Sequence, residues 1–508
     1  EVIRLVTPGT LTEDTLLDAR KNNYILSIAK QNNVYGFAWI DLSTGEFYTQ
    51  ETSFNSAMEC HELAGVLARL APGEILTADS LLEKPDLFSL FNEYREKLSV
   101  LPAARFNTNN ALKRLLNFYQ VQTLDSFGNF GRVEVTSAGV LLDYIANTQK
   151  IQMPRIARPL KIIYSKYMEI DASTRQSLDL TEGPHGASLI SVIDRTVSAC
   201  GARMLVSRLA NPLLDIEEIN GRYDVIDFFM RHNDVRDNLR QKLKGFPDAE
   251  RAVARLSAKR GGPRDLYSIL VALSVIPRLR SLIKAYKKID VVDELPPAVE
   301  NILKRLGEHY NLINQLSAAL DLSDPNNSLP YLARDGGFIA NGYNPELDNL
   351  RDMSRKGHDY IIGLQDKYIK ETGLDNLKIK YNSVIGYFIE VPNKSVSQLL
   401  GNPTFIHRQS VLNATRFSTA ELTELENKLR SATEKALALE LSIYDDLVRS
   451  VIIEADDISR SAAAVAELDI GAALADLALE YNYCRPKLDD SLCFEIEEGR
   501  HPMVEAAL

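Results

Sequence analysis

Apolar and polar residues in the first part of the chain follow patterns typical of strands mixed with helices. Apolar runs at 24–29, 34–41 and 46–50 predict strands, and Leu42-Ser43-Thr44-Gly45 has the composition of a hairpin turn. Helical spacing over 57–70 predicts a helix, and 74–76 is compatible with another short strand. Together they predict an α/β domain over roughly 11–135.

The apolar spacing becomes mainly helical from about residue 136 onward. Asn211-Pro212 interrupts the pattern, and Asp215 with Glu218 three residues later is the capping-box signature of a new helix. Gly261-Gly262-Pro263 marks another break before the helical spacing resumes. This part of the chain therefore predicts a helical body.

Residues 376–418 differ from their surroundings. The stretch 381–391 is rich in aromatic and β-branched residues and ends at Pro392-Asn393, which predicts one strand, with more β structure around 405–412. Glu390 is the one acid of this segment, against five basic residues, which leaves an excess of four positive charges. The basic residues are Lys378, Lys380, Lys394, Arg408 and Arg416.

The strongest helix pattern follows directly. Ser418-Thr419-Ala420-Glu421 is a capping box, in which the hydroxyl and the carboxylate each accept a backbone N–H of the first turn. Apolar periodicity then reaches about residue 479, and a helix of about 60 residues would be roughly 90 Å long, which suits a strut. Its first part is a heptad seam through Leu422, Leu425, Leu429, Ala432, Ala436, Leu439 and Ile443.

This seam requires a partner helix. The partner is either another helix of the same chain or a second chain in an intermolecular coiled coil. A helical pattern just upstream, at 344–371, favours the first alternative. Two long helices joined by a basic β segment is the simpler arrangement.

Composition sets further limits. The 508 residues suffice for about three to five domains, and hydrophobic (45%) and charged (25%) fractions are ordinary for a globular protein. No apolar run approaches the roughly 18 residues that span a bilayer, and no signal peptide is evident. The first residue is Glu, so we expect the chain to begin inside a longer protein. The four cysteines (Cys60, Cys200, Cys484 and Cys493) form no CxxC pair, which favours a reducing cytosol.

Motifs of common enzyme classes are absent from the sequence. It contains no GxxxxGK[ST] phosphate loop, no GxGxxG, no HExxH and no GxSxG, and its seven histidines show no metal-ligand spacing. The best enzymatic alternative is a two-metal nuclease using Asp41 and Glu46, since paired carboxylates hold such ions. No third acid is spaced to complete a site, so we favour the interpretation that these acids end one strand and begin the next.

The basic segment has the stronger functional case, although the net charge of −11 by itself counts against DNA binding. Lys and Arg neutralise phosphates, and Asn, Gln, Ser and Thr bond phosphate oxygens without reading the base sequence. Side chains of both kinds are mixed within this segment. The alternative is a solvated surface with a chance excess of positive charge.

Several segments together resemble the MutS family of mismatch recognition proteins, and the matches are collinear over essentially the whole chain. They are 1–10 (EVIRLVTPGT), 189–196 (LISVIDRT) with 201–205 (GARML), 208–213 (RLANPL), 334–339 (RDGGFI) with 342–344 (GYN), 381–382 (YN) through 386–389 (GYFI), 413–417 (NATRF) and 498–502 (EGRHP). The loop around 181–186 (TEGPHG) is shorter than is usual in the family.

The resemblance implies a multidomain α+β/α fold with an RNase H-like α/β connector, a mainly helical core with long levers, and a small β-rich clamp. Residues 1–10 would be the tail of a mismatch-binding domain and 11–149 the connector, which lacks nuclease activity in the family. Residues 150–350 would form the helical core and lever, and 351–418 the clamp. Residues 419–483 would form the returning lever and core, and 484–508 the start of an ATPase domain.

The resemblance also implies a function. The clamp would grip the backbone of duplex DNA through Lys380, Asn382, Lys394, Arg408, Asn413 and Arg416. The intact protein would be a DNA-dependent ATPase that uses ATP and Mg²⁺, forms a homodimer, meets a MutL-like repair partner through the connector, and works in the bacterial cytosol at the nucleoid, without a membrane. The family's mismatch-reading Phe and Glu and its Walker motifs would lie outside 1–508. We therefore expect no catalytic site, cofactor or metal within this chain. A MutS-like paralogue that acts in recombination remains an alternative.

Overall fold

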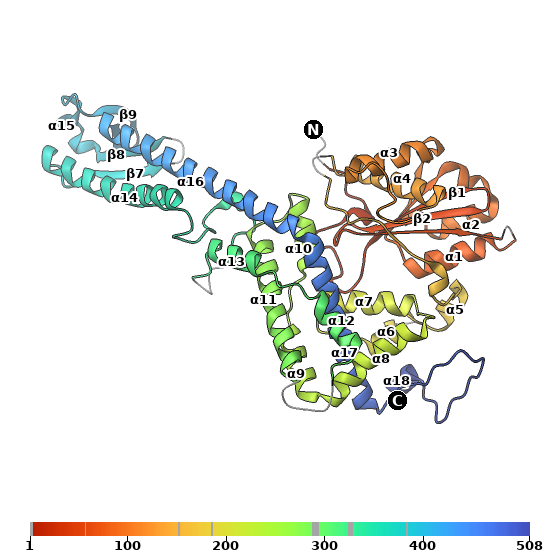
Figure 1. Ribbon diagram of the computed structural model, residues 1–508. Coiled ribbons are helices and arrows are strands. Elements are labelled where there is room, and N and C mark those ends of the chain that lie inside the picture. The colour runs from red at the N-terminus through yellow and green to blue at the C-terminus, as the bar shows by residue number, and fades with distance from the viewer. Residues whose placement is uncertain are drawn as a thin grey trace. The chain divides into compact units, whose positions relative to one another are not determined.

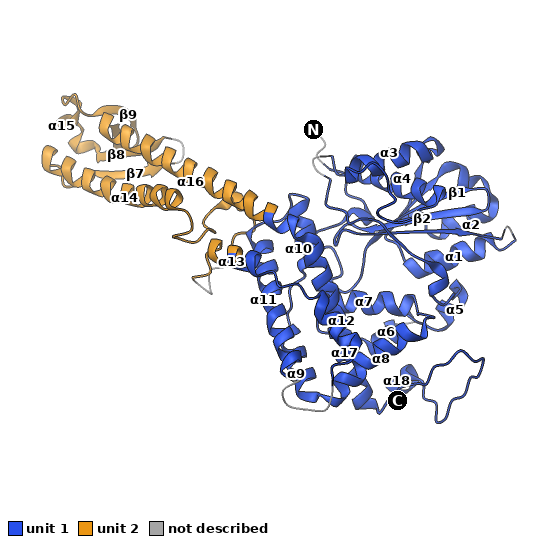
Figure 2. Ribbon diagram, in the orientation of Figure 1, with its two compact units in different colours: residues 1–314, 450–508 blue, residues 315–449 orange. Residues whose placement is uncertain are grey.

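The computed structural model describes residues 4–55, 57–150, 153–183, 186–286, 294–323, 329–382 and 385–507. The chain forms two compact units, which Figure 2 shows in different colours. Unit 1 comprises residues 1–314 and 450–508, and unit 2 comprises residues 315–449. Each unit has its own hydrophobic core.

Unit 1 contains a six-stranded mixed sheet in the order β5-β4-β1-β2-β3-β6. Figure 1 labels β1 and β2 within it. Strands β1, β2 and β3 are antiparallel neighbours, which confirms the predicted hairpin. By contrast, β4 runs parallel to β1, β5 runs parallel to β4, and β6 runs parallel to β3. The strands are β1 (Tyr24–Gln31), β2 (Val34–Asp41), β3 (Glu46–Ser53), β4 (Glu74–Ala78), β5 (Leu98–Leu101) and β6 (Leu160–Lys161).

Helices cover both faces of this sheet. Successive side chains of a strand point to opposite faces, so Ile25 of β1 packs with α3 and α4, while the adjacent Leu26 packs with α1 and α2. Both faces are therefore buried, which explains why these strands read as continuous apolar runs. The covering helices are α1 (Glu59–Leu70), α2 (Pro85–Glu93), α3 (Thr108–Tyr119) and α4 (Arg132–Thr148).

The rest of unit 1 is mainly helical, as predicted. Its central helix α17 packs against α7, α8, α9 and α10. Small residues permit this packing: a Cβ atom added at Gly471 of α17 would lie 2.6 Å from the side chain of Val225 in α8. The helices are α5 (Ala172–Ser177), α6 (Leu189–Ile193), α7 (Ala199–Ala210), α8 (Ile216–Arg231), α9 (Asn233–Leu243), α10 (Ala249–Ser257), α11 (Pro263–Tyr286), α12 (Pro297–Arg305), α17 (Ala455–Tyr481) and α18 (Pro502–Ala507). Helix α13 (Tyr310–Ala319) crosses the boundary between the units along the chain.

Helix α11 qualifies the prediction about apolar runs. Its residues 263–285 are long and apolar enough to cross a membrane by length and composition, although charged residues interrupt the run. One side of the helix, which includes Leu266, Ile269 and Leu273, is buried, and α11 packs against α9, α10 and α17. These contacts explain the apolar composition of α11, because it is a core helix of unit 1.

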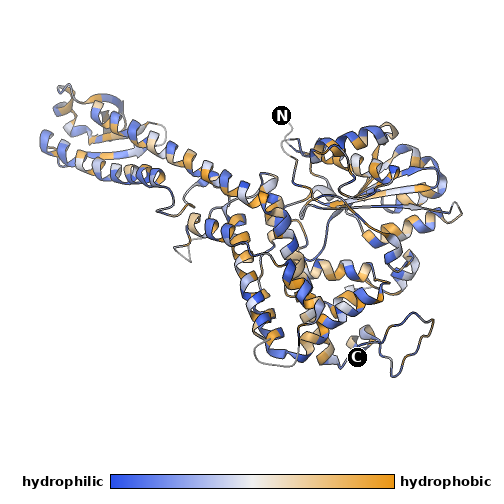
Figure 3. Cartoon of the chain, in the orientation of Figure 1, coloured by the Kyte–Doolittle hydropathy of each residue, from blue (hydrophilic) through white to orange (hydrophobic). Residues whose placement is uncertain are grey.

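Unit 2 is built on two long helices, α14 (Pro345–Thr372) and α16 (Ala420–Ile453), which pair antiparallel. Ser354 Oγ lies 3.1 Å from Thr433 Oγ1, and further along α14 the Tyr368 hydroxyl lies 2.6 Å from Thr419 Oγ1. Figure 3 shows hydrophobic and hydrophilic residues alternating along both helices. The heptad seam therefore finds a partner within the same chain, as the upstream helical pattern predicted.

A four-stranded antiparallel sheet in the order β7-β8-β10-β9 joins α14 to α16. The prediction of one strand over 381–391 was wrong, because β7 and β8 form a hairpin in which Asn382 pairs with Gly386, whose φ of 74° favours glycine. The inner face of the sheet carries Ile389 and Phe417, which belong to the core of unit 2. The elements are β7 (Lys378–Asn382), β8 (Gly386–Pro392), α15 (Val396–Leu400), β9 (Ile406–Ser410) and β10 (Ala414–Ser418).

The start of α16 differs from the predicted capping box. Thr419, one residue later than predicted, accepts the hydrogen bond from the backbone N–H of Leu422 at 3.0 Å. The carboxylate of Glu421 pairs instead with Lys367 of α14, at 2.8 Å. The neighbouring helix thus provides a stronger partner for Glu421 than the backbone of its own first turn.

The predicted helix of about 60 residues is divided at Glu454 into α16 and α17. The loop before α13 contacts this division: His309 Nδ1 lies 3.0 Å from Glu454 Oε2, and His309 Nε2 lies 2.9 Å from Ser461 Oγ. These contacts join residues about 150 positions apart in the chain. No local pattern in 420–481 could therefore have predicted the break.

Candidate nucleic-acid interface

A row of polar side chains crosses the outer face of the small sheet in unit 2. The strand register pairs Lys378 with Glu390, Glu390 with Arg416, and Arg416 with Gln409. Directly paired residues point to the same side of a sheet. The opposite face carries Ile389 in the core, so the polar row faces away from the core of unit 2.

Arg416 is held from three directions. Its Nη1 donates a hydrogen bond to Gln409 Oε1 at 2.9 Å, and its Nε lies 3.7 Å from Glu390 Oε2. Its guanidinium carbon lies 4.5 Å from the centre of the Phe388 ring. The side chain remains 22% exposed. A guanidinium fixed in this way presents a planar donor group that matches the geometry of a phosphate.

Glu390 organises the two cations of this face. Lys380 Nζ lies 2.6 Å from Glu390 Oε1, and this hydrogen bond, with Arg416 nearby, lowers the pKa of Glu390. Glu390 therefore stays ionised at neutral pH and holds Lys380 and Arg416 close together. One carboxylate only partly neutralises these two charges, so the row keeps an excess of positive charge.

Arg408 and Lys394 are exposed and have no ion-pair partner among the residues that the structure describes. Arg408 is the extra residue of a β-bulge, because the register between β9 and β10 passes from Gln409 directly to His407. Lys394 lies in a single 3-10 turn, Asn393–Ser395, immediately after β8. Both side chains are therefore available to an anion in solution.

The two predicted amides occupy different places. Asn413 is exposed in the turn between β9 and β10, and its carbonyl oxygen accepts a hydrogen bond from the backbone N–H of Asn393 at 3.4 Å, next to Lys394. Asn382 is half-buried at the end of β7. The structure thus brings together Lys380 with Arg416 and Lys394 with Asn413. Asn382 and Arg408 lie on the two edge strands of the sheet.

Lys378 belongs to the polar row but was not among the predicted contacts. It is exposed on β7 and pairs with Glu390 across the strands, on the same face as Lys380. Residues two apart in a strand share a face. This period of two was a signal in the sequence that could have identified Lys378 together with Lys380.

The two carboxylates considered for a nuclease are bonded within the protein itself. Asp41 is fully buried, and its Oδ1 accepts hydrogen bonds from the N–H and the hydroxyl of Ser43 at 2.8 and 2.6 Å. Its Oδ2 accepts one from the N–H of Asn23 at 3.0 Å, and Glu46 accepts one from the Tyr48 hydroxyl at 3.1 Å. In the described part of the chain, no three His, Cys, Asp or Glu side chains are grouped to hold a metal ion. This geometry supports a role in fixing the hairpin.

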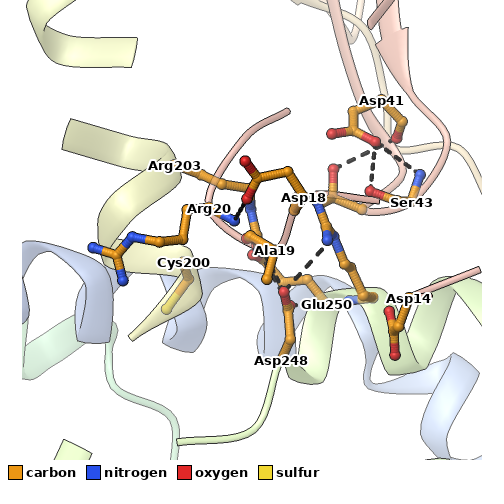
Figure 4. Close-up of polar contacts among 12 residues, drawn as sticks. Asp14, Asp18, Ala19, Arg20, Asp41, Ser43, Cys200, Arg203, Asp248 and Glu250 are labelled. Atoms are coloured by element: carbon orange, nitrogen blue, oxygen red, sulfur yellow. Dashed lines mark hydrogen bonds and ion pairs between the residues drawn. The ribbon is translucent and has the colours of Figure 1, made fainter. Parts of the chain in front are cut away.

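A buried ionic cluster, which the sequence did not reveal, lies where the sheet of unit 1 meets its helices (Figure 4). Arg203 of α7 is 4% exposed, and its Nη2 lies 3.1 Å from Asp248 Oδ1 and 3.2 Å from Glu250 Oε2. Its Nη1 donates to the carbonyl oxygen of Ala19 at 3.0 Å. Burial, and next the charge of Glu46, raise the pKa of Glu250 to about 8. The cluster joins the two parts of unit 1.

Comparison with known proteins gives consistent matches. The family models that match are "MutS domain II" over residues 23–157 and "MutS domain III" over residues 173–475. Similar proteins include the DNA mismatch repair proteins MutS of Roseobacter denitrificans, Dinoroseobacter shibae and Ruegeria pomeroyi, each 41% identical over 514 aligned residues. These alignments cover 100% of this chain and 56% of each relative. The chain therefore spans little more than half the length of these relatives.

Proposed function

The chain belongs to the MutS family of DNA mismatch repair proteins, and on that premise we propose that the small sheet of unit 2 binds the phosphate backbone of duplex DNA. The observation that carries this proposal is the polar row on the outer face of the sheet, in which Arg416 is fixed between Glu390 and Gln409. The proposed contacts are Lys380, Asn382, Lys394, Arg408, Asn413 and Arg416, and the row adds Lys378.

The distribution of charge supports contact with the backbone without base reading. The cations are spread over β7, β9 and β10 and the turn after β8, as a surface that follows a line of phosphates requires. The chain as a whole carries −11, so the attraction must be local. A range of about 8–10 Å at ordinary ionic strength is consistent with an effect confined to this sheet.

The remaining family properties are proposals for the intact protein. It would hydrolyse ATP with Mg²⁺, form a homodimer and work with a MutL-like partner at the connector, in the bacterial cytosol. The RNase H-like description of the first domain and the boundaries at 10, 149, 350, 418 and 483 stay predictions, as does the alternative of a paralogue that acts in recombination. The family match favours repair, because the similar proteins carry that name.

Binding of a fluorescent DNA duplex by the 508-residue chain, measured at several salt concentrations, tests the proposal. We expect Lys394→Ala and Arg408→Ala each to weaken binding severalfold, and each to reduce the slope of log affinity against log salt by about one. Arg416→Ala should weaken binding further than Arg416→Lys. The lysine variant keeps the charge but loses the planar donor group.

Arg430→Ala is the matched control, since this α16 arginine is 71% exposed in the same unit and lies outside the sheet. Its affinity for DNA and its salt slope should equal those of the unaltered chain. Equal losses in Arg430→Ala and Arg408→Ala would contradict the assignment to the sheet. Binding without salt dependence would contradict the phosphate contacts altogether.

A further inference from the structure

Unit 1 contains a cavity of about 330 Å³, bordered by strands β1 to β3 and by α1, α7 and α8. The volume falls in the range of about 300–1,000 Å³ that small-molecule sites occupy. Its aromatic lining consists of Tyr24, Trp39, Tyr48 and Tyr167. Its cationic lining consists of Lys21, Arg69, Arg208 and Arg222, against one acid, Glu182, among the described lining residues.

Arg69, in the last turn of α1, is a buried cation without a counter-ion. It is 8% exposed, and its guanidinium carbon lies 5.8 Å from the centre of the Trp39 ring. Its Nη1 donates to Asn211 Oδ1 at 3.2 Å, and its Nη2 donates to Gln50 Oε1. Its Nε has no hydrogen-bond partner, and no carboxylate lies within ion-pair distance in the described part of the chain. Buried charges are normally paired, so an anion that reached Arg69 would gain a charge partner there.

The other two arginines of the cavity also lack a strong negatively charged partner. Arg208 Nη2 lies 3.7 Å from Glu467 Oε1, but both oxygens of Glu467 already accept hydrogen bonds from Arg305, at 2.8 and 2.7 Å. Arg222 has no ion pair among the described residues. Burial lowers the pKa of Arg69 and that of Arg208 to about 10 each. Burial thus desolvates the three guanidinium groups, and nearby carboxylates neutralise their positive charge only weakly.

A neutral acceptor completes the lining. Asn22 Nδ2 donates to the Tyr24 hydroxyl at 2.7 Å, whereas Asn22 Oδ1 is buried with no hydrogen-bond partner among the described residues. Such an oxygen gains a bond when a ligand N–H reaches it. The cavity therefore combines donors for an anion, aromatic walls, and one unused acceptor.

We propose that this cavity binds a small aromatic anion of the nucleoside monophosphate class. Guanidinium groups bond phosphate oxygens in a bidentate manner, and aromatic side chains stack on nucleobases of any sequence. The Asn22 oxygen would accept a hydrogen bond from an exocyclic amino group of the base. This site lies in unit 1 and uses none of the residues proposed to contact DNA.

Calorimetric titration of the 508-residue chain tests the proposal, with adenosine monophosphate, inorganic phosphate and adenosine as separate probes. We expect adenosine monophosphate to bind at least tenfold more tightly than either of the other two. Arg222→Gln should weaken adenosine monophosphate at least fivefold and leave adenosine unchanged. Asn22→Asp, which places a negative charge beside the site, should weaken the nucleotide as well.

Arg460→Gln is the control, because this exposed α17 arginine carries the same charge in unit 1 outside the cavity. Its thermal unfolding and its affinity for the nucleotide should match those of the unaltered chain. Phosphate binding as tight as that of the nucleotide would overturn the role of the aromatic walls. No saturable nucleotide binding, or equal losses in Arg222→Gln and Arg460→Gln, would overturn the proposal. Either result leaves the DNA proposal standing, because none of the proposed DNA contacts lines the cavity.

Discussion

At the scale of single residues, one buried carboxylate fixes the loop that leads into α14. Glu440 of α16 is 4% exposed and accepts backbone N–H groups from Gly337, Phe338 and Ile339 at 3.0, 2.8 and 3.0 Å. It also accepts a hydrogen bond from Arg351 Nη2 at 2.9 Å. The Glu440 side chain thus joins the loop to both α14 and α16. It is the hydrogen-bond acceptor for all four of these donors.

Replacement of this carboxylate should destabilise unit 2. In Glu440→Ala the buried N–H groups lose their acceptor, and we expect the free energy of unfolding to fall by about 3 kcal/mol. Urea denaturation followed by circular dichroism measures the change. Glu434→Ala, at a 72% exposed position of the same helix, should change it by less than about 0.5 kcal/mol. Similar effects of the two substitutions would contradict the role of Glu440.

At the scale of elements, two glycines of α14 have different reasons to be there. A Cβ atom added at Gly357 would lie 1.8 Å from Leu429 Cδ2 of α16 and 2.8 Å from its Cγ, whereas one added at Gly363 would meet nothing within 4 Å. Gly357 therefore permits the close approach of α14 and α16. Gly363 costs helix stability without a packing role in the described structure.

Alanine substitutions should separate these two roles. We expect Gly363→Ala to stabilise unit 2 by about 0.5–1 kcal/mol through helix propensity alone. Gly357→Ala should lose this gain, because its methyl group displaces Leu429. In a Leu429→Ala background, Gly357→Ala should again stabilise unit 2, because the leucine side chain no longer blocks the added methyl group. A double-mutant cycle by chemical denaturation measures this difference. Equal gains at both positions in the unaltered background would contradict the close packing at Gly357.

At the scale of the whole molecule, buried ionisable groups connect the sheet of unit 1 to its helices. Glu250 of α10 faces Arg203 of α7, Asp248 and Glu46 of β3. Its pKa is raised, so the folded state holds a proton that the unfolded chain releases. This contribution to stability is fully present below pH 4.5 and is lost as the pH rises to about 8.

This linkage predicts a specific pH dependence. Between pH 5 and pH 8, the melting temperature of the unaltered chain should fall more than that of Glu250→Gln, which cannot ionise at this position. We expect the difference to be on the order of a few degrees. Differential scanning calorimetry across this range measures it. Glu300→Gln, at an exposed position of α12, should keep the pH profile of the unaltered chain. A profile unchanged in Glu250→Gln would contradict the raised pKa.

The local sequence by itself determined much of the secondary structure and of the charge distribution of this protein. The meander of β1 to β3, the helical body, the heptad seam and the locally basic segment 376–418 all follow from residues close together in the chain. Periodicity and charge are local properties, so no tertiary information was needed to predict them. The family was predicted in the same way, from collinear segments, and the comparisons confirm it.

Only the tertiary structure decided which side chains meet. The pairing of Glu390 with Lys380 and Arg416 depends on the strand register, and Arg408 leaves that register through a bulge. The division of the long helix at Glu454 and the arginine-lined cavity join segments more than a hundred residues apart. Contacts of this kind arise from packing across elements, which the order of residues within any one element does not determine.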